Sequence, residues 1–364
     1  GSTIIGDANR DFISLTLDTL ADDYQHGIEL LAETLMAPAF NRDDFLRLQK
    51  QQLDELVSER QAPARLASLV GLRAVLGERL GNPVSGGEKS VSKLTLADVR
   101  AWYQTYVYPG AVSLCVVGPV DPSQVQLAAE AALARLKGKR PAIEQPQQSP
   151  TPESTRIYVL DRPGSVQSAI FVAQPFPKRQ EAGYAARQLL DNVLGGQFTS
   201  RINQNLRERH AYTYGAHSTA IATRYFGLMT VSTSVRTEVT VPAVQEIIQE
   251  LREIRGSSPQ RPIASDELQR ARAGLVQRLG AHLEDSHRLI DDYEQLFVYG
   301  LAPNYLESYL TETRQLPSAA LATEASRLDP DRLIITMVGD AASLREQLER
   351  VHWQALPVPP EWVD

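Results

Sequence analysis

Histidine and cysteine are the side chains with which this chain would bind a transition metal or begin nucleophilic catalysis. The nearest pair of histidines, His282 and His287, is five residues apart. On one helix that spacing puts the two rings on different sides, whereas helical metal motifs space their ligands three or four residues apart. We therefore expect a solvated helix end here and no zinc site. The other histidines are scattered along the chain: His26, His210, His217 and His352.

Motifs for other common reactions are absent from the sequence. It contains no His-x-x-Glu-His, His-Glu-x-x-His, Gly-x-Ser-x-Gly or phosphate-binding loop. The single cysteine, Cys115, lies in the apolar run 114–117, which predicts a small buried core side chain rather than a nucleophile. One cysteine also excludes an intramolecular disulfide and a zinc–thiolate cluster.

The segment 189–218 is the most informative part of the sequence. We expect a helix to end at Gly195-Gly196, because glycine is common just after a helix C-terminus. A polar, amphipathic helix is expected to begin near Ser200 and to continue to about His210. A strand carrying Tyr212 and Tyr214 should follow.

This segment resembles the pitrilysin-type zinc metallopeptidases, the inverzincins, which include insulysin and the mitochondrial processing peptidase. Their second domain typically carries Leu-Gly-Gly, Ser-Arg-Leu, Leu-Arg-Glu and Gly-Leu-x-Tyr in that order. The matching residues here are Leu194-Gly195-Gly196, Ser200-Arg201-Ile202, Leu206-Arg207-Glu208 and Ala211-Tyr212-Thr213-Tyr214-Gly215. Further matches follow the family's order over essentially the whole chain: Pro38-Ala39-Phe40, Gly86-Gly87, Leu94-Thr95, Tyr103, Tyr106, Pro109 and Val117-Gly118.

The resemblance implies a fold and two site residues. The implied fold is α+β, with two related units, each a mainly antiparallel sheet packed by helices, that form half of a clamshell around a peptide chamber. Arg207 and Tyr214 match the family's Arg/Tyr pair, which reaches a substrate bound at the partner's zinc. The phenol would donate to the scissile carbonyl and the guanidinium would add positive charge. Spacing alone favours a simpler interpretation, in which Arg207 pairs with Glu208 or with solvent and Tyr214 packs.

The sequence departs from the family at the metal. The family's zinc ligands are the two histidines of His-x-x-Glu-His and a distal glutamate, and that motif is missing here. Glu55 matches the distal glutamate, but Leu48 replaces the acid expected seven residues earlier, and a solvated helix residue is at least as good an interpretation of Glu55. We expect no cofactor in this chain, with zinc held by a homologous partner subunit or by a further segment.

The elements that must position these residues fall into two parts, separated by a Pro/Gln-rich linker at 141–152. Before the linker, periodicity predicts strands at 12–17 and 111–118 and helices at 22–35, 43–60, 63–80 and 95–103. After it, we expect strands at 157–160, 169–172, 225–235 and 333–338 and helices at 183–194, 241–254 and 265–283.

The order of elements repeats along the chain. Asp44 aligns with Asp266, 222 residues later, and the apolar run 113–118 aligns with 334–339. We therefore predict a first repeat at 1–140 and a second at 153–364. The counterparts of residues 153 to about 220 would precede Gly1, so the first repeat is expected to lack its N-terminal part.

Composition limits the partners. The chain has 364 residues, 43% of them hydrophobic, and a formal net charge of −7 with no basic run. Nucleic acid is therefore an unsuitable partner, since phosphates require a cationic surface. No apolar stretch of about 18 residues is present, so we expect no membrane span. Bacterial members of the family suggest the periplasm.

Three functions remain open. The first is a non-catalytic, substrate-binding subunit or half of a zinc metalloendopeptidase, inactive without its zinc-bearing partner. The second is a zinc metalloendopeptidase whose His-x-x-Glu-His segment is missing from this chain. The third is a structural scaffold subunit, which would have no need of an intact Arg207/Tyr214 pair. The peptide substrate cannot be named from the sequence.

Overall fold

The computed structural model describes residues 2–142, 146, 151–257 and 260–363. The chain folds into two compact units, and each unit combines separate stretches of the sequence. Unit 1 comprises Gly1–Glu55, Val84–Gln145 and Gly280–Tyr305, and unit 2 comprises Leu56–Pro83, Pro146–Leu279 and Leu306–Asp364. Most of the predicted linker at 141–152 lies outside the described residues, so the division into 1–140 and 153–364 stays a prediction.

The described residues of unit 1 are mainly helical and contain one β-hairpin, so the sheet packed by helices that we predicted for each unit is found only in unit 2. Strands β1 and β2 pair antiparallel, from Thr3 opposite Asp18 to Ala8 opposite Ile13. Helix α1 packs on β2 through Gly27, where an added Cβ would lie 2.9 Å from the Leu17 side chain. The bounds of its elements are β1 (Thr3–Ala8), β2 (Ile13–Asp18), α1 (Tyr24–Met36), α2 (Arg42–Glu59, ending in unit 2), α4 (Glu88–Val91), α5 (Leu96–Tyr106), α6 (Pro122–Leu133) and α11 (Ser286–Tyr299).

The strand predicted at 111–118 is wrong. A short 3-10 turn covers Pro109–Ala111, and the residues that follow have no regular secondary structure. Within the described residues no strand pairs with this run, and an apolar segment without a hydrogen-bonding neighbour does not become a strand. Cys115 is accordingly only half-buried, where we predicted a core side chain.

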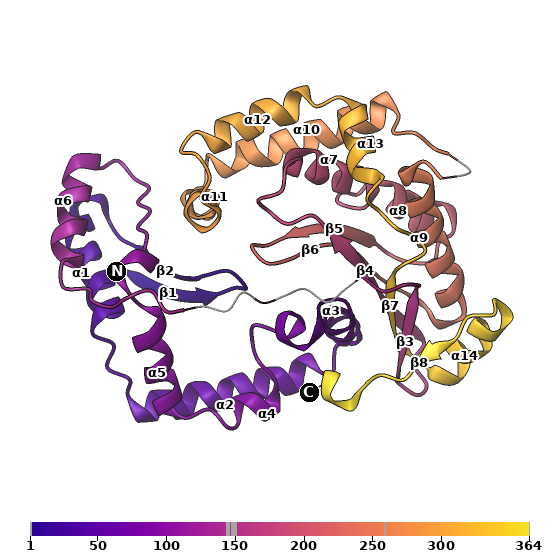
Figure 1. The fold of residues 1–364 in the computed structure, drawn as a ribbon, viewed down its shortest axis with the longest axis horizontal. Coiled ribbons are helices and arrows are strands. Elements are labelled where there is room, and N and C mark those ends of the chain that lie inside the picture. Colours follow the sequence, from indigo (N-terminus) through magenta and orange to yellow (C-terminus); the bar gives the residue numbers. More distant parts are fainter. Residues whose placement is uncertain (1, 143–145, 147–150, 258–259, 364) are drawn as a thin grey trace. The chain divides into compact units, whose positions relative to one another are not determined.

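Unit 2 is built around a six-stranded sheet with the strand order β5-β6-β4-β7-β3-β8 (Figure 1). The pairs from β5 to β7 are antiparallel, whereas β3 pairs parallel with β7 and β8, so the sheet is mixed rather than mainly antiparallel. Its strands are β3 (Arg156–Asp161), β4 (Gln167–Phe176), β5 (Ala216–Ala222), β6 (Gly227–Arg236), β7 (Ile334–Gly339) and β8 (Ala355–Leu356). Its helices are α3 (Pro63–Gly81), α7 (Tyr184–Leu194), α8 (Arg201–Asn203), the π-helix η3 (Gln204–Arg209), α9 (Thr240–Arg255), α10 (Ser265–His282, ending in unit 1), α12 (Tyr305–Gln315, beginning in unit 1), α13 (Ser318–Ala325) and α14 (Ala341–Arg350).

Helices cover both faces of this sheet. Alternation along β4 points Phe171 to the face packed by α3, and Ile170 to the opposite face, on the side of α9 (Figure 1). Seven consecutive residues of β4, from Ser168 to Gln174, are buried, which explains why this strand reads as a continuous apolar run. No described helix combines the length and the apolar character that crossing a bilayer requires.

The closest packing between α3 and the sheet depends on Gly71. A Cβ at this position would lie 2.3 Å from Cδ1 of the buried Phe171 ring and 3.3 Å from the Thr336 hydroxyl. We expect Gly71→Ala to lower the free energy of unfolding by about 1–3 kcal/mol, because the ring has to move within a packed core. Chemical denaturation followed by circular dichroism measures this change.

A glycine in an open position serves as the control. Gly280 lies within α10 and has no neighbouring atom within 4 Å of an added Cβ. Gly280→Ala should stabilise the chain by up to about 1 kcal/mol through helix propensity. If Gly71→Ala were as neutral or stabilising as Gly280→Ala, the close approach of α3 to β4 would be wrong.

Candidate functional site

The segment that the sequence singled out starts where helix α7 ends. The Gly195 N–H donates to the Asp191 carbonyl at 2.9 Å, so the helix ends where we predicted. Glycine is required there because a Cβ on Gly195 would lie 2.4 Å from the backbone nitrogen of Ser218 in β5. The Ser218 hydroxyl donates to the Asp191 carboxyl. Burial raises the pKa of Asp191 above its usual range, and the hydrogen bond from Ser218 opposes that shift only in part.

Residues 201–209 form a helix of two kinds. One α-helical turn, α8, is followed by the π-helix η3. Ile202 and Leu206 anchor its inner side in the core. The chain leaves the helix at Ala211, which has a φ of +52°. The sequence predicted a helix from Ser200 to His210 but not its change of type, since so short a segment does not distinguish the two periodicities. π-helical turns inside helices are frequent at functional sites.

Arg207 lies on the outer side of this π-helix. Its side chain is 36% exposed, and its Nε stands 3.4 Å from the Glu208 carboxylate. The guanidinium carbon lies 4.4 Å from the centroid of the Phe198 ring, within the range of a cation–π contact. Phe198 itself is 59% exposed, so this contact lies at the protein surface. No sequence pattern indicated a role for Phe198, because its contact with Arg207 depends on how the chain between the two residues folds.

Tyr214 is not part of a strand, contrary to our prediction. It occupies a bend, and β5 begins only at Ala216. The Thr213 hydroxyl holds this bend: its oxygen lies 2.9 Å from the Gly215 carbonyl and 2.8 Å from the Ser234 carbonyl, and its one proton can be donated to either. The Tyr214 side chain projects outward and is 92% exposed, so it does not pack within this chain. The structure therefore presents both predicted residues at the surface of unit 2, seven positions apart on one segment.

A chain of buried and half-buried polar contacts joins this segment to the helices packed against it. Arg201 makes a two-pronged ion pair with Glu267, with Nε and Nη2 at 2.8 and 2.7 Å from the carboxylate oxygens. Its Nη1 and Nη2 also donate to the carbonyls of Arg261 and Pro262. Asn205 donates to Glu246 and Glu250 of α9 at 2.9 and 2.8 Å.

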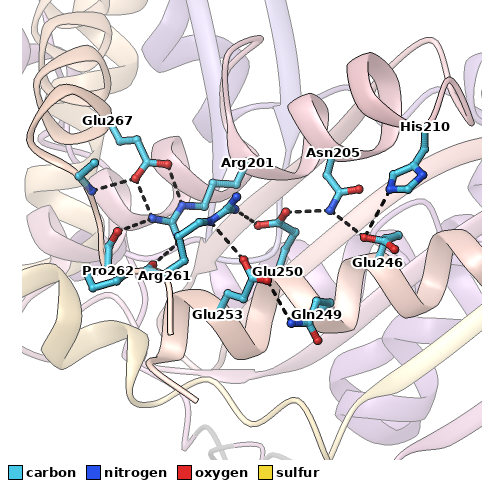
Figure 2. A network of polar contacts seen from close by, with 11 residues as sticks. Arg201, Asn205, His210, Glu246, Gln249, Glu250, Glu253, Arg261, Pro262 and Glu267 are labelled. Atoms are coloured by element: carbon cyan, nitrogen blue, oxygen red, sulfur yellow. Dashed lines mark hydrogen bonds and ion pairs between the residues drawn. The ribbon is translucent and has the colours of Figure 1, made fainter. Parts of the chain in front are cut away.

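Figure 2 shows these contacts as one continuous network that joins the helix 201–209 to α9 and to the start of α10. Arg261 continues it by pairing with Glu250 and, at 3.2 Å, with Glu253. His210 closes the other end, 3.8 Å from Glu246. The network therefore links the helix 201–209 to α9 and α10, two helices that follow later in the chain.

Glu55 is the residue that matches the family's distal glutamate, and we also expected it to be a solvated helix residue. It is exposed on α2, where it accepts a hydrogen bond from Gln51 at 3.0 Å, and Leu48 is also exposed. In the part of the chain that the structure describes, no group of three or more His, Cys, Asp or Glu is arranged to hold a metal ion. The described residues alone thus offer no ligand set for a zinc ion.

His282 and His287 belong to two successive helices rather than to one. His282 ends α10 and lies 2.9 Å from Asp292, whereas His287 is in the first turn of α11 and lies 3.0 Å from Asp18. The hydrogen bond and the negative charge of Asp18 raise the pKa of His287 above its usual value. His287 is exposed, as expected for a solvated helix end.

Comparisons with known proteins agree with the resemblance. The model of the family described as peptidase M16 inactive domain matches residues 93–275. An uncharacterized zinc protease of Mycobacterium tuberculosis is 25% identical over 202 residues, which are 55% of this chain and 46% of that protein. The chain thus spans about half the length of this relative.

Two solved structures share the fold. A peptidase M16 inactive domain from Pseudomonas fluorescens superposes with a TM-score of 0.84 at 24% identity, covering 93% of this chain and 81% of that chain. A protease from Helicobacter pylori gives a TM-score of 0.84 at 18% identity, covering 93% and 82%. The α+β architecture described above is therefore that of known M16 inactive domain structures.

The pairing of Glu267 makes stability depend on pH. Burial acts to raise the pKa of Glu267, but hydrogen bonds from Arg201 and from the Ala264 N–H outweigh it, and the pKa lies below its usual value. The ionised carboxylate therefore stabilises the folded chain above an unfolded-state pKa of about 4.3, and this contribution is lost as the pH falls through the lower folded-state pKa. We expect Glu267→Gln to lower the free energy of unfolding at pH 7 by about 2 kcal/mol.

The difference between wild type and variant should shrink as the pH falls below about 4.3, because the Glu267 carboxyl of the unfolded chain then takes up a proton, whereas that of the folded chain does so only at lower pH. Denaturant unfolding at a series of pH values measures it. Asp266→Asn, which changes the same charge at the neighbouring exposed position, should have a far smaller effect. A difference for Glu267→Gln that stayed constant down to the folded-state pKa would contradict the ion pair.

Proposed function

The chain belongs to the M16 peptidase family, and from that membership we propose that it is a non-catalytic, substrate-binding subunit or half of a zinc metalloendopeptidase. The observation that carries this proposal is the exposure of Tyr214. An aromatic ring that is 92% exposed contributes little to packing, so its role lies in contact with another molecule. Arg207 stands on the same segment with its guanidinium at the surface, against Phe198.

The proposed chemistry is electrostatic. As a peptide bond is attacked, negative charge grows on its carbonyl oxygen, and a positioned phenol can donate a hydrogen bond to that oxygen. A guanidinium adds permanent positive charge and two parallel donors. Tyr214 and Arg207 would supply these two groups, while the attacking water would be activated elsewhere. The substrate class that fits is a polypeptide, because backbone carbonyls are the acceptors that such donors recognise.

Zinc would come from a partner. The described residues offer no ligand set for it, and the M. tuberculosis relative, of which this chain spans about half, is named a zinc protease. A homologous zinc-bearing subunit, or a zinc-bearing segment of a longer protein, would complete the enzyme. In the second case the whole protein would be a zinc metalloendopeptidase. For its location we propose the bacterial periplasm, on the strength of bacterial family members alone.

We also propose that residues 1–140 are a first repeat and 153–364 a second. Helices α2 and α10 both have 18 residues, and α5 and α13 begin 222 residues apart, which supports the alignment made from the sequence. In this alignment the run 113–118 corresponds to β7, which pairs with β3 on one side and β4 on the other. A first repeat that lacks counterparts of β3 and β4 would leave this run without partners.

Substitution of the pair tests the proposed function. Full-length chain is mixed with zinc-bearing homologues, which carry His-x-x-Glu-His, from the same source, and cleavage of a fluorogenic peptide library is followed. We expect Arg207→Ala and Tyr214→Phe each to lower kcat/KM about a hundredfold, because each removes a donor to the transition state. The zinc content of the complex, measured by atomic absorption, should not change.

Arg209→Ala is the matched control, since Arg209 is an exposed arginine on the same π-helix and its loss changes the net charge equally. It should leave cleavage within about twofold of wild type. Unaltered cleavage by both Arg207→Ala and Tyr214→Phe would refute the proposed function and favour a scaffold subunit.

A further inference from the structure

Arg201 has no part in the chemistry proposed above, yet its side chain is far more buried than that of Arg207. Its side chain is 2% exposed. Four hydrogen bonds of 2.7–2.9 Å join its guanidinium to Glu267 and to the carbonyls of Arg261 and Pro262. A planar fork of donors is needed to reach these acceptors together, which a lysine ammonium does not provide.

The bonds of Arg201 fix one end of a short helix, and those of Asn205 fix its middle. Arg201 ties the first turn to the start of α10 and to the preceding loop, while Asn205 ties the next turn to α9 (Figure 2). The buried Ile202 and Leu206 set only which side of the helix faces the core. The polar contacts add a directional constraint against sliding along the helix axis, since the hydrophobic effect itself is non-directional.

Stability alone is a weak reason for such a pair. Removing a charge pair from water costs several kcal/mol per ion, and apolar residues of the same volume often stabilise as well or better. What a buried, two-pronged pair adds is one defined geometry. The residue that gains from it stands one turn and a half further on, where Arg207 leaves the same helix toward Phe198.

We propose that Arg201 is a positioning residue for Arg207: its fork on Glu267 and on the 261–262 carbonyls fixes the π-helix so that the Arg207 guanidinium stands at the surface. This inference rests on the proposed function of Arg207. Loss of the fork would let the helix 201–209 shift or unwind without unfolding the six-stranded sheet.

Arg187 offers a matched control. It is also a buried arginine of unit 2, paired with Glu324 and donating to the carbonyls of Ala182 and Glu181. None of these partners belongs to 198–214. Arg187→Lys should therefore disturb a comparable buried site while leaving the π-helix in place.

The first measurement is amide hydrogen exchange of the full chain, which needs no activity. The Ala211 and Tyr212 N–H groups donate to the carbonyls of Arg207 and Leu206 and so report on the π-helix. Arg201→Lys should raise their exchange rates at least about tenfold, and Arg187→Lys should not. Glu267→Gln, which keeps an acceptor oxygen, should have the same effect to a smaller extent, and it substitutes for Arg201→Lys if that variant does not fold.

The second measurement is a double-mutant cycle on peptide cleavage with the zinc-bearing partner. Arg201→Lys should lower kcat/KM about tenfold when Arg207 is present and less than about twofold in the Arg207→Ala background. Arg187→Lys should give equal, small losses in both backgrounds. A merely structural role of Arg201 predicts the same loss with and without Arg207.

The two measurements distinguish failure of the proposed function from failure of the positioning role of Arg201. If Arg207→Ala itself leaves cleavage unchanged, the proposed function is refuted, and the exchange measurement alone decides whether Arg201 holds the helix. Unchanged exchange at 211–212 in Arg201→Lys, or equal losses in the two backgrounds, overturns the positioning role.

Discussion

A guanidinium can be taken out of water only where acceptors stand at the ends of its fork, and the region around Arg201 is organised by that requirement. One carboxylate and two loop carbonyls meet the fork, and they come from residues about 60 positions further along the chain. The same loop leads into α10, and its Arg261 turns back to Glu250 on α9. The hydrogen bonds that satisfy Arg201 therefore also position the loop before α10 and tie that loop to α9 and α10. The surface that carries Arg207 rests on this buried set.

The sequence predicted the local part of the candidate site better than its long-range part. Glycine after α7 marked the end of that helix correctly, because helix termination is decided by neighbouring residues. Glycine is required at position 195 because the Ser218 backbone comes close to it. Ser218 lies in β5, which follows the helix 201–209, so this contact is not visible in the local sequence. The partner of Arg201 is 66 positions away, and no periodicity indicates it. Tyr214 was expected on a strand because strand composition does not reveal where the bend before β5 ends.

The fold was predictable wherever a segment's own pattern decides its state. The helices α2, α3, α9 and α10 lie within one or two residues of the predicted ranges. The runs 113–118 and 334–339 have similar apolar composition, yet only the second forms a strand. Ile334–Gly339 lies between two hydrogen-bonding neighbours, and its counterpart lies beside no described strand. Strand formation is thus a property of the pair, which a single sequence window does not contain.

Ala211 joins the π-helix to the bend that carries Tyr214. The inverzincin pattern has glycine at this position, whereas this chain has alanine in a left-handed conformation. The alanine methyl group makes that conformation less favourable by about 1 kcal/mol. The hydrogen bonds of the Ala211 and Tyr212 amides hold the chain in this conformation. Under the proposed function, the Tyr214 phenol would therefore meet a polypeptide three residues beyond a strained backbone position, with the hydrogen-bonded helix 201–209 on its other side.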